Sequence, residues 1–187
     1  DILGDISTSG EAGTLRLDVV GQDSLAVGGT TYSAYRTNLT FNVTFFGTPY
    51  EIHGNAWFRT TDLSPIKLNF SFTIVIFFPI TSSITITYDP PFSIQWPLTT
   101  GKTWNLASEV TVVAEVTGNP PETETALVSG TASVRADETV VVPAGPFTAT
   151  PLRQTEAGGN YSESRWSDEA GNSVQEQSYN STGTETS

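Results

Sequence analysis

The chain contains no cysteine and no methionine among its 187 residues. The absence of cysteine excludes disulfide bonds, thiolate nucleophiles and cysteine-ligated zinc sites. Because both sulfur-containing residues are missing, the chain also lacks the main targets of side-chain oxidation. A secreted protein of this composition would have to be held together by core packing, metal ions, sugars or neighbouring subunits.

Basic residues are scarce as well, since 8 Lys and Arg stand against 20 Asp and Glu and give a formal net charge of −12. Such a charge disfavours nucleic acids and anionic membrane surfaces as partners. No stretch reaches the roughly 18 apolar residues that a membrane-spanning helix needs, so we expect no membrane span. The first residue is Asp1 rather than methionine, which we interpret as a mature form whose signal peptide has been removed.

Two N-glycosylation sequons lie on one short segment, residues 37–45, in which polar and apolar residues alternate without interruption. This period of two predicts a half-buried β-strand with its asparagines on the outer face. Five N-x-[ST] sequons occur in the whole chain, and together they indicate a glycan-coated extracellular protein. The predicted glycosylation sites are Asn38, Asn42, Asn69, Asn160 and Asn180.

Thr, Val, Ile and aromatic residues dominate the chain, with Gly and Pro between the runs. This composition is typical of strands, and helix-forming residues never recur at helical spacing over ten residues. We therefore predict an all-β fold, either an antiparallel β-sandwich or an open half-barrel of about ten strands. The strands are expected at residues 14–20, 32–46, 50–60, 66–78, 83–88, 108–117, 125–135, 138–142, 147–155, 160–167 and 172–180.

Residues 1–13 are predicted to be an N-terminal extension, and residues 14–187 a single β domain. The extension is rich in Gly and Ser but carries Ile2, Leu3 and Ile6. An apolar strand of this kind can pair with the open sheet of a neighbouring molecule, so we predict these three as assembly residues and copies of the same chain as the partner. The alternatives are edges that are shielded by glycans or a closed barrel that has no edges.

Candidate catalytic residues are few. His53 is the only histidine, so any Ser-His-Asp triad would have to use it, and no G-x-S-x-G motif supplies a nucleophile. We therefore expect no enzymatic activity, no cofactor and no metal site. A structural calcium ion and a glycosidase pair of carboxylates remain alternatives to solvated acidic turns. The acidic pairs concerned are Glu122 and Glu124, Asp137 and Glu138, and Asp168 and Glu169.

Trp57 is the best candidate for stacking a sugar ring, because it shares a predicted outer face with His53 and Arg59. Packing in the core or in an interface is the alternative for this side chain.

Three segments follow one another in the second half of the chain: residues 96–104 (WPLTTGKTW), residues 138–147 (ETVVVPAGPF) and a late turn between Trp166 and Gly171. In this order they resemble secreted archaeal and bacterial surface proteins with PLxxGKxW and VPAGxF motifs, and the resemblance covers about residues 85–177. It implies an antiparallel, strongly curved sheet outside the cell and no catalytic residues. It also implies one further strand after the late turn, so that a sheet lacking it would be completed by another subunit.

These observations predict a secreted, N-glycosylated cell-surface protein of archaeal type with a structural role. We expect it to polymerise into an extracellular filament or sheath by β-strand addition between subunits. The alternative is an extracellular binding module for a glycan or a lipid.

Overall fold

The structure is a computed structural model that describes residues 2–8, 11–45, 48–75 and 79–186. Within these residues the chain forms strands and turns, and no helix is found. Accordingly, the described part contains no helix that is long and apolar enough to cross a membrane. The strands are β1 (Ile2–Thr8), β2 (Glu11–Val27), β3 (Thr30–Phe45), β4 (Thr48–Arg59), β5 (Pro65–Val75), β6 (Pro79–Asp89), β7 (Thr103–Val116), β8 (Glu122–Val134), β9 (Glu138–Val142), β10 (Gly145–Glu156), β11 (Tyr161–Ser167) and β12 (Asn172–Tyr179).

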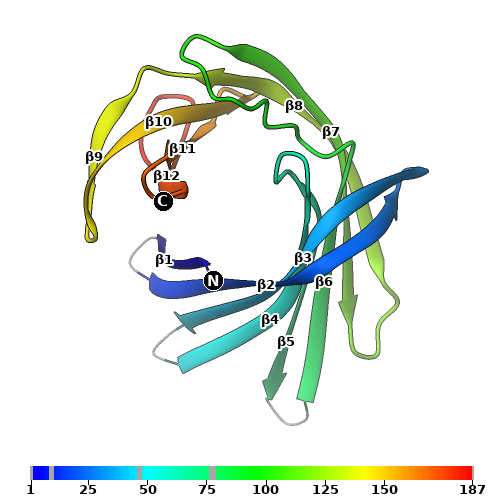
Figure 1. The fold of residues 1–187 in the computed structure, drawn as a ribbon. Coiled ribbons are helices and arrows are strands. Elements are labelled where there is room, and N and C mark those ends of the chain that lie inside the picture. The colour runs from blue at the N-terminus through cyan, green and yellow to red at the C-terminus, as the bar shows by residue number, and fades with distance from the viewer. Residues whose placement is uncertain (1, 9–10, 46–47, 76–78, 187) are drawn as a thin grey trace. The chain divides into compact units, whose positions relative to one another are not determined.

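The strands belong to one antiparallel sheet with the order β1-β2-β3-β4-β5-β6-β7-β8-β10-β11-β12, and β9 pairs with β10 beside this path (Figure 1). The order is linear, so the sheet is open and has β1 at one end and β12 at the other. The prediction of an all-β, antiparallel fold of about ten strands is confirmed, and a single open sheet is found rather than a sandwich of two.

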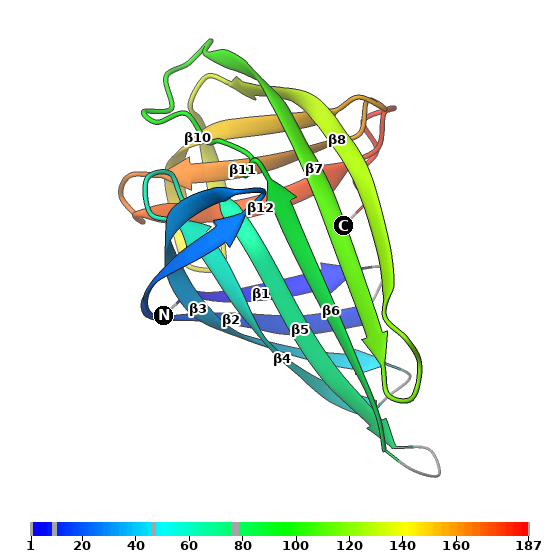
Figure 2. The ribbon, with the colours of Figure 1, turned by 90° about the vertical axis from the view of Figure 1, so that its right-hand side faces the viewer.

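The chain divides into two compact units. Unit 1 consists of residues 1–94 and 108–127, and unit 2 consists of residues 95–107 and 128–187. Strands β7 and β8, which run side by side in Figure 2, each contribute residues to both units.

Unit 1 is built from strands with one apolar face and one polar face. Leu39 of β3, Ala56 of β4 and Ile66 of β5 are buried on the apolar face. Ala56 is paired with Leu68 across β4 and β5, and Leu39 is paired with Gly54 across β3 and β4. The side chains of Leu39, Ala56 and Leu68 therefore lie on the same apolar face of the sheet. The alternation that is visible in the sequence therefore sets which face each strand buries.

Two glycines mark places where neighbouring strands approach unusually closely. A Cβ atom added to Gly54 would lie 2.1 Å from the backbone oxygen of Asn69 on β5. One added to Gly130 of β8 would lie 2.1 Å from the backbone oxygen of Thr155 on β10. Only a residue without a side chain fits at such a distance.

Unit 2 has its core where β8 and β10 meet the segment that precedes and begins β7. Ala132, Val134, Leu152, Trp104 and Leu106 are all buried. The turn at Gly101 is joined to β8, because Gly101 N donates to Val134 O at 2.9 Å and Val134 N donates to Lys102 O at 2.9 Å.

The loop before β7 is fixed by contacts of its own. Lys102 Nζ donates to the backbone oxygens of Gln95 at 2.6 Å and Pro97 at 3.3 Å, and the rings of Trp96 and Trp166 meet edge to face at 5.1 Å. The three sequence segments noted above, residues 96–104, 138–147 and 166–171, all lie in unit 2.

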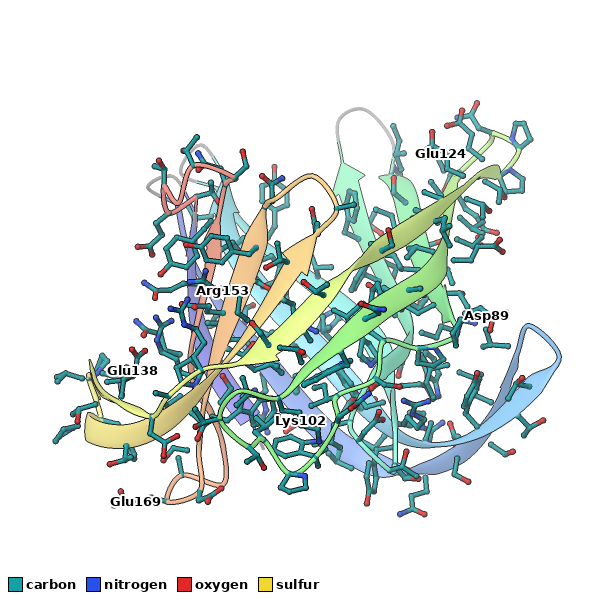
Figure 3. All side chains as sticks on the ribbon, turned by 90° about the horizontal axis from the view of Figure 1, so that it is seen from above. Asp89, Lys102, Glu124, Glu138, Arg153 and Glu169 are labelled. Carbon is teal, nitrogen blue, oxygen red and sulfur yellow. The ribbon has the colours of Figure 1, made fainter. Side chains whose placement is uncertain are left out.

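The β7–β8 hairpin is exposed on both of its faces, because every residue from 115 to 127 is exposed. Glu124 lies near its tip (Figure 3). Leu127 is 78% exposed although it is apolar. The predicted acidic pair Glu122 and Glu124 thus lies on a solvated strand.

The predicted strand positions agree with the structure to within about four residues at their ends, apart from three longer additions. Strands also occur at residues 2–8, 21–27 and 103–107. Residues 103–107 alternate, since Trp104 and Leu106 are buried between exposed neighbours, but an alternating run of five residues is a weak signal for a strand. Parts of the predicted strands 32–46 and 66–78, namely residue 46 and residues 76–78, lie outside the described residues.

Candidate glycosylation and assembly sites

Two sequons lie on the outer face of β3. Asn38 and Asn42 are exposed, whereas Leu39 is buried and Phe41 and Val43 are half-buried. Asn42 Nδ2 donates to Thr14 Oγ1 on β2, but only at 3.4 Å. Both amides are therefore placed where an attached glycan would extend into solvent.

The third sequon is more constrained. Asn69 of β5 is half-buried, and its Nδ2 donates to Thr85 Oγ1 on β6 at 2.8 Å. The strand registers place it in a row of polar residues across β2 to β6, which consists of Asp18, Asn38, Asn55, Asn69 and Thr85. Attachment of a glycan at Nδ2 would require Asn69 to give up its bond to Thr85.

The last two sequons lie in unit 2, where Asn160 contacts the turn that Asn180 begins. Asn160 Oδ1 accepts a hydrogen bond from Ser181 N at 3.1 Å. Asn180 Oδ1 accepts from Thr182 N at 3.0 Å and from Thr182 Oγ1 at 2.6 Å. In both residues these bonds engage the oxygen rather than the nitrogen that glycosylation modifies.

The predicted assembly residues Ile2, Leu3 and Ile6 lie on β1. This strand pairs antiparallel with β2 of the same chain, from Ile2 opposite Leu17 to Thr8 opposite Glu11. Ser9 and Gly10, which join the two strands, lie outside the described residues. The segment that we predicted to pair with a neighbouring molecule is thus the terminal strand of the sheet and has β2 as its neighbour.

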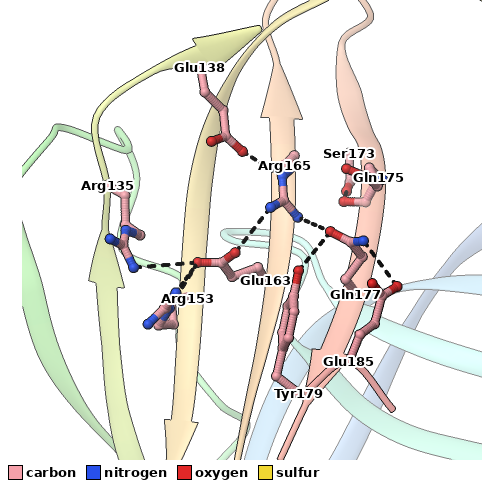
Figure 4. Close-up of polar contacts among 10 residues, drawn as sticks. All are labelled: Arg135, Glu138, Arg153, Glu163, Arg165, Ser173, Gln175, Gln177, Tyr179 and Glu185. Atoms are coloured by element: carbon pink, nitrogen blue, oxygen red, sulfur yellow. Dashed lines mark hydrogen bonds and ion pairs between the residues drawn. The ribbon is translucent and has the colours of Figure 1, made fainter. Parts of the chain in front are cut away.

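A cluster of charged side chains on one face of unit 2 did not emerge from the sequence. It consists of Arg135, Arg153, Glu163 and Arg165 and is called the Glu163 cluster (Figure 4). The Glu163 side chain is only 7% exposed; its Oε1 lies 2.8 Å from Arg153 Nη2 and its Oε2 lies 3.1 Å from Arg165 Nη2. Arg135 Nη1 is more distant, at 3.8 Å. One buried carboxylate is thus surrounded by three guanidinium groups.

Arg165 links the cluster to two further strands. Its Nε donates to Glu138 Oε1 of β9 at 2.6 Å, and its Nη1 donates to Gln177 Oε1 of β12 at 2.8 Å. Burial alone would lower the pKa of Arg165, but the hydrogen bonds to Glu138 and Tyr179 and the charges of Glu138 and Glu163 raise it above the usual value. Arg165 therefore stays charged, and its role is to join β9, β11 and β12.

An aromatic stack continues the same face. The Arg153 guanidinium lies 4.0 Å from the ring centroid of Tyr161, and the rings of Tyr161 and Tyr179 are stacked at 4.6 Å with an angle of 16°. Cation–π and stacking contacts of this kind each contribute about 1 kcal/mol. Because the carboxylate and the guanidinium groups are bound to one another, this arrangement is suited to holding strands together rather than to acid–base chemistry.

Little in the sequence predicts this cluster, because Arg153 and Glu163 lie 10 residues apart along the chain and Arg135 precedes both. The one available signal was the alternation of Tyr161, Glu163 and Arg165 on β11. That alternation predicts a strand but no ion-pair cluster, since charged side chains on a strand usually face solvent.

A second buried ion pair closes the β4–β5 turn in unit 1. The guanidinium of Arg59 contacts both carboxylate oxygens of Asp62, with Nε 2.7 Å from Oδ1. Arg59 Nη2 also donates to Ser93 Oγ at 2.8 Å, and Ser64 N donates to Asp62 Oδ1 at 3.3 Å. Burial by itself would raise the pKa of Asp62, but the hydrogen bonds from Arg59 and Ser64 and the Arg59 charge hold it below its usual value.

We expect this pair to make the stability of the protein depend on pH in the acid range. The folded-state pKa of Asp62 lies below the unfolded value of about 3.9, so its contribution is complete above that value and is lost as the pH falls through the folded pKa. Urea unfolding at several pH values should show this loss in the wild type. The difference between the wild-type and Asp62→Asn curves should shrink as the pH falls; a constant difference would contradict the assignment.

The remaining candidates from the sequence stay apart from one another. His53 Nε2 lies 3.7 Å from Glu51 Oε2, and both side chains are more than half exposed. Trp57 is half-buried, and its Nε1 donates to Asp23 Oδ2 at 3.0 Å. Lys67 Nζ lies 5.6 Å from the Trp57 ring centroid. The Trp57 ring therefore lies at the surface between charged side chains and is not a core residue.

The acidic pairs are likewise dispersed. Asp137 Oδ1 accepts a hydrogen bond from Thr150 Oγ1 at 2.7 Å, and Glu138 is bound to Arg165. Asp168 and Glu169 are exposed in the β11–β12 turn. In the part of the chain that the structure describes, no group of three or more His, Cys, Asp or Glu side chains could hold a metal ion.

Comparison with protein-family models, with curated proteins and with solved structures finds no match to this chain.

Proposed function

We propose that this chain is a secreted, N-glycosylated structural protein of the cell surface, related to archaeal and bacterial surface proteins. We further propose that it polymerises into an extracellular filament or sheath by exchange of β-strands between subunits. A structural rather than an enzymatic role is favoured because the buried charged groups that we find are bound in ion pairs.

The observation that carries this proposal is the position of β1. It is a terminal strand of an open sheet, and among the described residues it pairs only with β2. An identical β1 from another copy could form the same backbone hydrogen bonds with β2, so exchange between copies would preserve the ladder from Ile2–Leu17 to Thr8–Glu11. Exchange of an identical element is a low-cost route to association.

Repetition of this exchange would produce a chain of subunits. If each copy gives β1 to the next and receives one from the previous copy, the contact is head-to-tail and need not close into a ring. Strand addition satisfies backbone groups along the whole length of the strand. In a chain without disulfides, the backbone hydrogen bonds between β1 and β2 of neighbouring copies would then hold the assembly together.

The exposed sequons are consistent with the same role. Asn38 and Asn42 lie on the outer face of β3, two strands away from β1 in the sheet order. Glycans there would leave the β1–β2 ladder free, and together with the net charge of −12 they would keep an assembly soluble.

A glycan-binding module is the second candidate, and the surroundings of Trp57 favour it. Asp23 accepts the indole N–H, Arg36 Nε lies 3.6 Å from the same Asp23 oxygen, and Lys67 lies beside the ring. An aromatic ring rimmed by charged hydrogen-bonding groups is a common way to bind a sugar.

Deletion of residues 1–8 separates the two candidates. We expect the full-length protein to form filaments that are visible by electron microscopy, and the deletion variant to form none, because β2 then has no strand to exchange. A glycan-binding module would keep its affinity for sugars after the same deletion. Leu127→Ser, which changes an exposed apolar residue of unit 1 outside β1, is the control and should still form filaments. A full-length protein that stays monomeric at high concentration would contradict the assembly proposal.

A further inference from the structure

At the other end of the sheet, the last two residues of β12 are covered by the residues that follow the strand. Thr186 N donates to Ser178 O at 2.8 Å, and Tyr179 forms an isolated antiparallel bridge with Glu185. The inner edge of β12 is already paired with β11. Residues 180–186 therefore occupy the outer edge of β12 at Ser178 and Tyr179, where another strand would otherwise add.

The turn that does this is organised around one side chain. Asn180 Oδ1 accepts hydrogen bonds from Thr182 N, from Thr182 Oγ1 and from Thr184 N, at 3.0, 2.6 and 2.9 Å. Asn180 N donates to Thr184 O at 3.0 Å, and Gly183, with φ of +80°, allows the chain to reverse. An asparagine that accepts several bonds from its own turn fixes the local backbone.

Two further contacts anchor the turn to unit 2. Gln177 Nε2 on β12 donates to Glu185 Oε1 at 3.0 Å. Ser181 N donates to Asn160 Oδ1, just before β11, at 3.1 Å. Since Gln177 also accepts a hydrogen bond from Arg165, the turn is connected to the Glu163 cluster (Figure 4).

We propose that residues 180–186 form an edge cap that keeps β12 from pairing with β12 of a second copy. Exposed edge strands are normally protected by lysine, proline or bulges, whereas β12 (NSVQEQSY) has neither lysine nor proline and carries Glu176 as its single charge. The edge cap supplies the protection that the strand itself lacks. A second copy would present the same edge, so pairing would be antiparallel about a two-fold axis.

This inference does not depend on exchange of β1, because it concerns the opposite end of the strand order. It is also compatible with glycosylation of Asn180. The three bonds that organise the edge cap use Oδ1, so Nδ2 can carry a glycan without their loss. A glycan there would add bulk at the edge that the cap already covers.

The test uses the full chain produced in a bacterial cytoplasm without N-glycosylation, so that changes in the sequon do not alter the sugar content. Asn180→Ala removes the acceptor of three hydrogen bonds, and Thr182→Ser is the matched control that keeps the hydroxyl. We expect amide hydrogen exchange of residues 181–186 to become at least about tenfold faster in Asn180→Ala and to stay unchanged in the control.

Pairing of β12 with β12 of a second copy, once the edge cap is lost, is detected by cross-linking one introduced cysteine. Because the chain has no cysteine, Gln175→Cys on β12 places one thiol near the middle of the strand. A short bismaleimide should join two copies of Gln175→Cys/Asn180→Ala but not of Gln175→Cys alone. If Asn180→Ala leaves the exchange unchanged, adding Thr186→Pro removes the N–H that binds Ser178 and frees the cap. Faster amide hydrogen exchange without cross-linked dimers would overturn the proposal. This outcome does not depend on whether copies of the chain swap β1.

Discussion

Replacing Gly54 by alanine is expected to destabilise the protein by about 3 kcal/mol, because the new Cβ atom would lie 2.1 Å from the backbone oxygen of Asn69. A side chain in the way could rotate aside, but a carbonyl oxygen within a paired strand can move only if β4 and β5 separate. Gly130→Ala should behave alike, since its Cβ atom would lie 2.1 Å from Thr155 O. The free energy of unfolding in urea measures both effects.

The matched control is Gly21→Ala in β2. A Cβ atom at Gly21 has nothing within 4 Å, so this substitution tests only the change in backbone freedom and should alter the free energy of unfolding by less than about 1 kcal/mol. Similar values for Gly21→Ala and Gly54→Ala would show that the close approach of β4 and β5 does not determine the effect.

Glu163→Gln is expected to lower the stability of unit 2 by about 3 kcal/mol. The substitution keeps the size of the side chain but replaces one acceptor oxygen by a donor that faces Arg153 or Arg165. Both guanidinium groups are largely buried, with side-chain exposures of 28% and 12%. A buried charge that loses its partner destabilises a protein far more than the same loss at the surface.

Glu138→Gln provides the comparison for this experiment. Glu138 also pairs with Arg165, but its side chain is 46% exposed, so water can replace the lost contact and the change should be under about 1 kcal/mol. The unfolding of unit 2 can be followed by tryptophan fluorescence, because Trp96, Trp104 and Trp166 all belong to it. Equal effects of the two substitutions would mean that burial of Glu163 does not govern its contribution.

The positions of the strands could be predicted because the alternation that indicates a strand lies within that strand's own residues. In β3 the alternation of Asn38, Leu39 and Asn42 with their neighbours gives both the strand and its exposed face, and the structure places these residues accordingly. The same is true of β5, where Leu68 and Asn69 face opposite sides. The order of the strands follows almost directly, since each strand except β9 pairs in sequence order along the sheet.

The Glu163 cluster and the edge cap could not be predicted in the same way. Arg153 and Glu163 meet only because β10 and β11 pair in one register, with these two residues opposite each other, and a shift by one residue would turn them to different faces. The edge cap depends on Asn180, which the sequence presents as a sequon without any sign of its hydrogen bonds. Alternation limits which registers are possible, but it does not identify the hydrogen bonds of a turn or the side chains that meet across paired strands.

The row of polar residues across β2 to β6 has a consequence for crowding on that face. Asn38 and Asn69 are separated by the single strand β4, so their attachment points would lie only about 10 Å apart, and Asn38 and Asn42 about 13 Å apart along β3. Glycans at such spacing would overlap and form one continuous layer over this face of the strands. Large molecules such as proteases would be kept away from this face of unit 1.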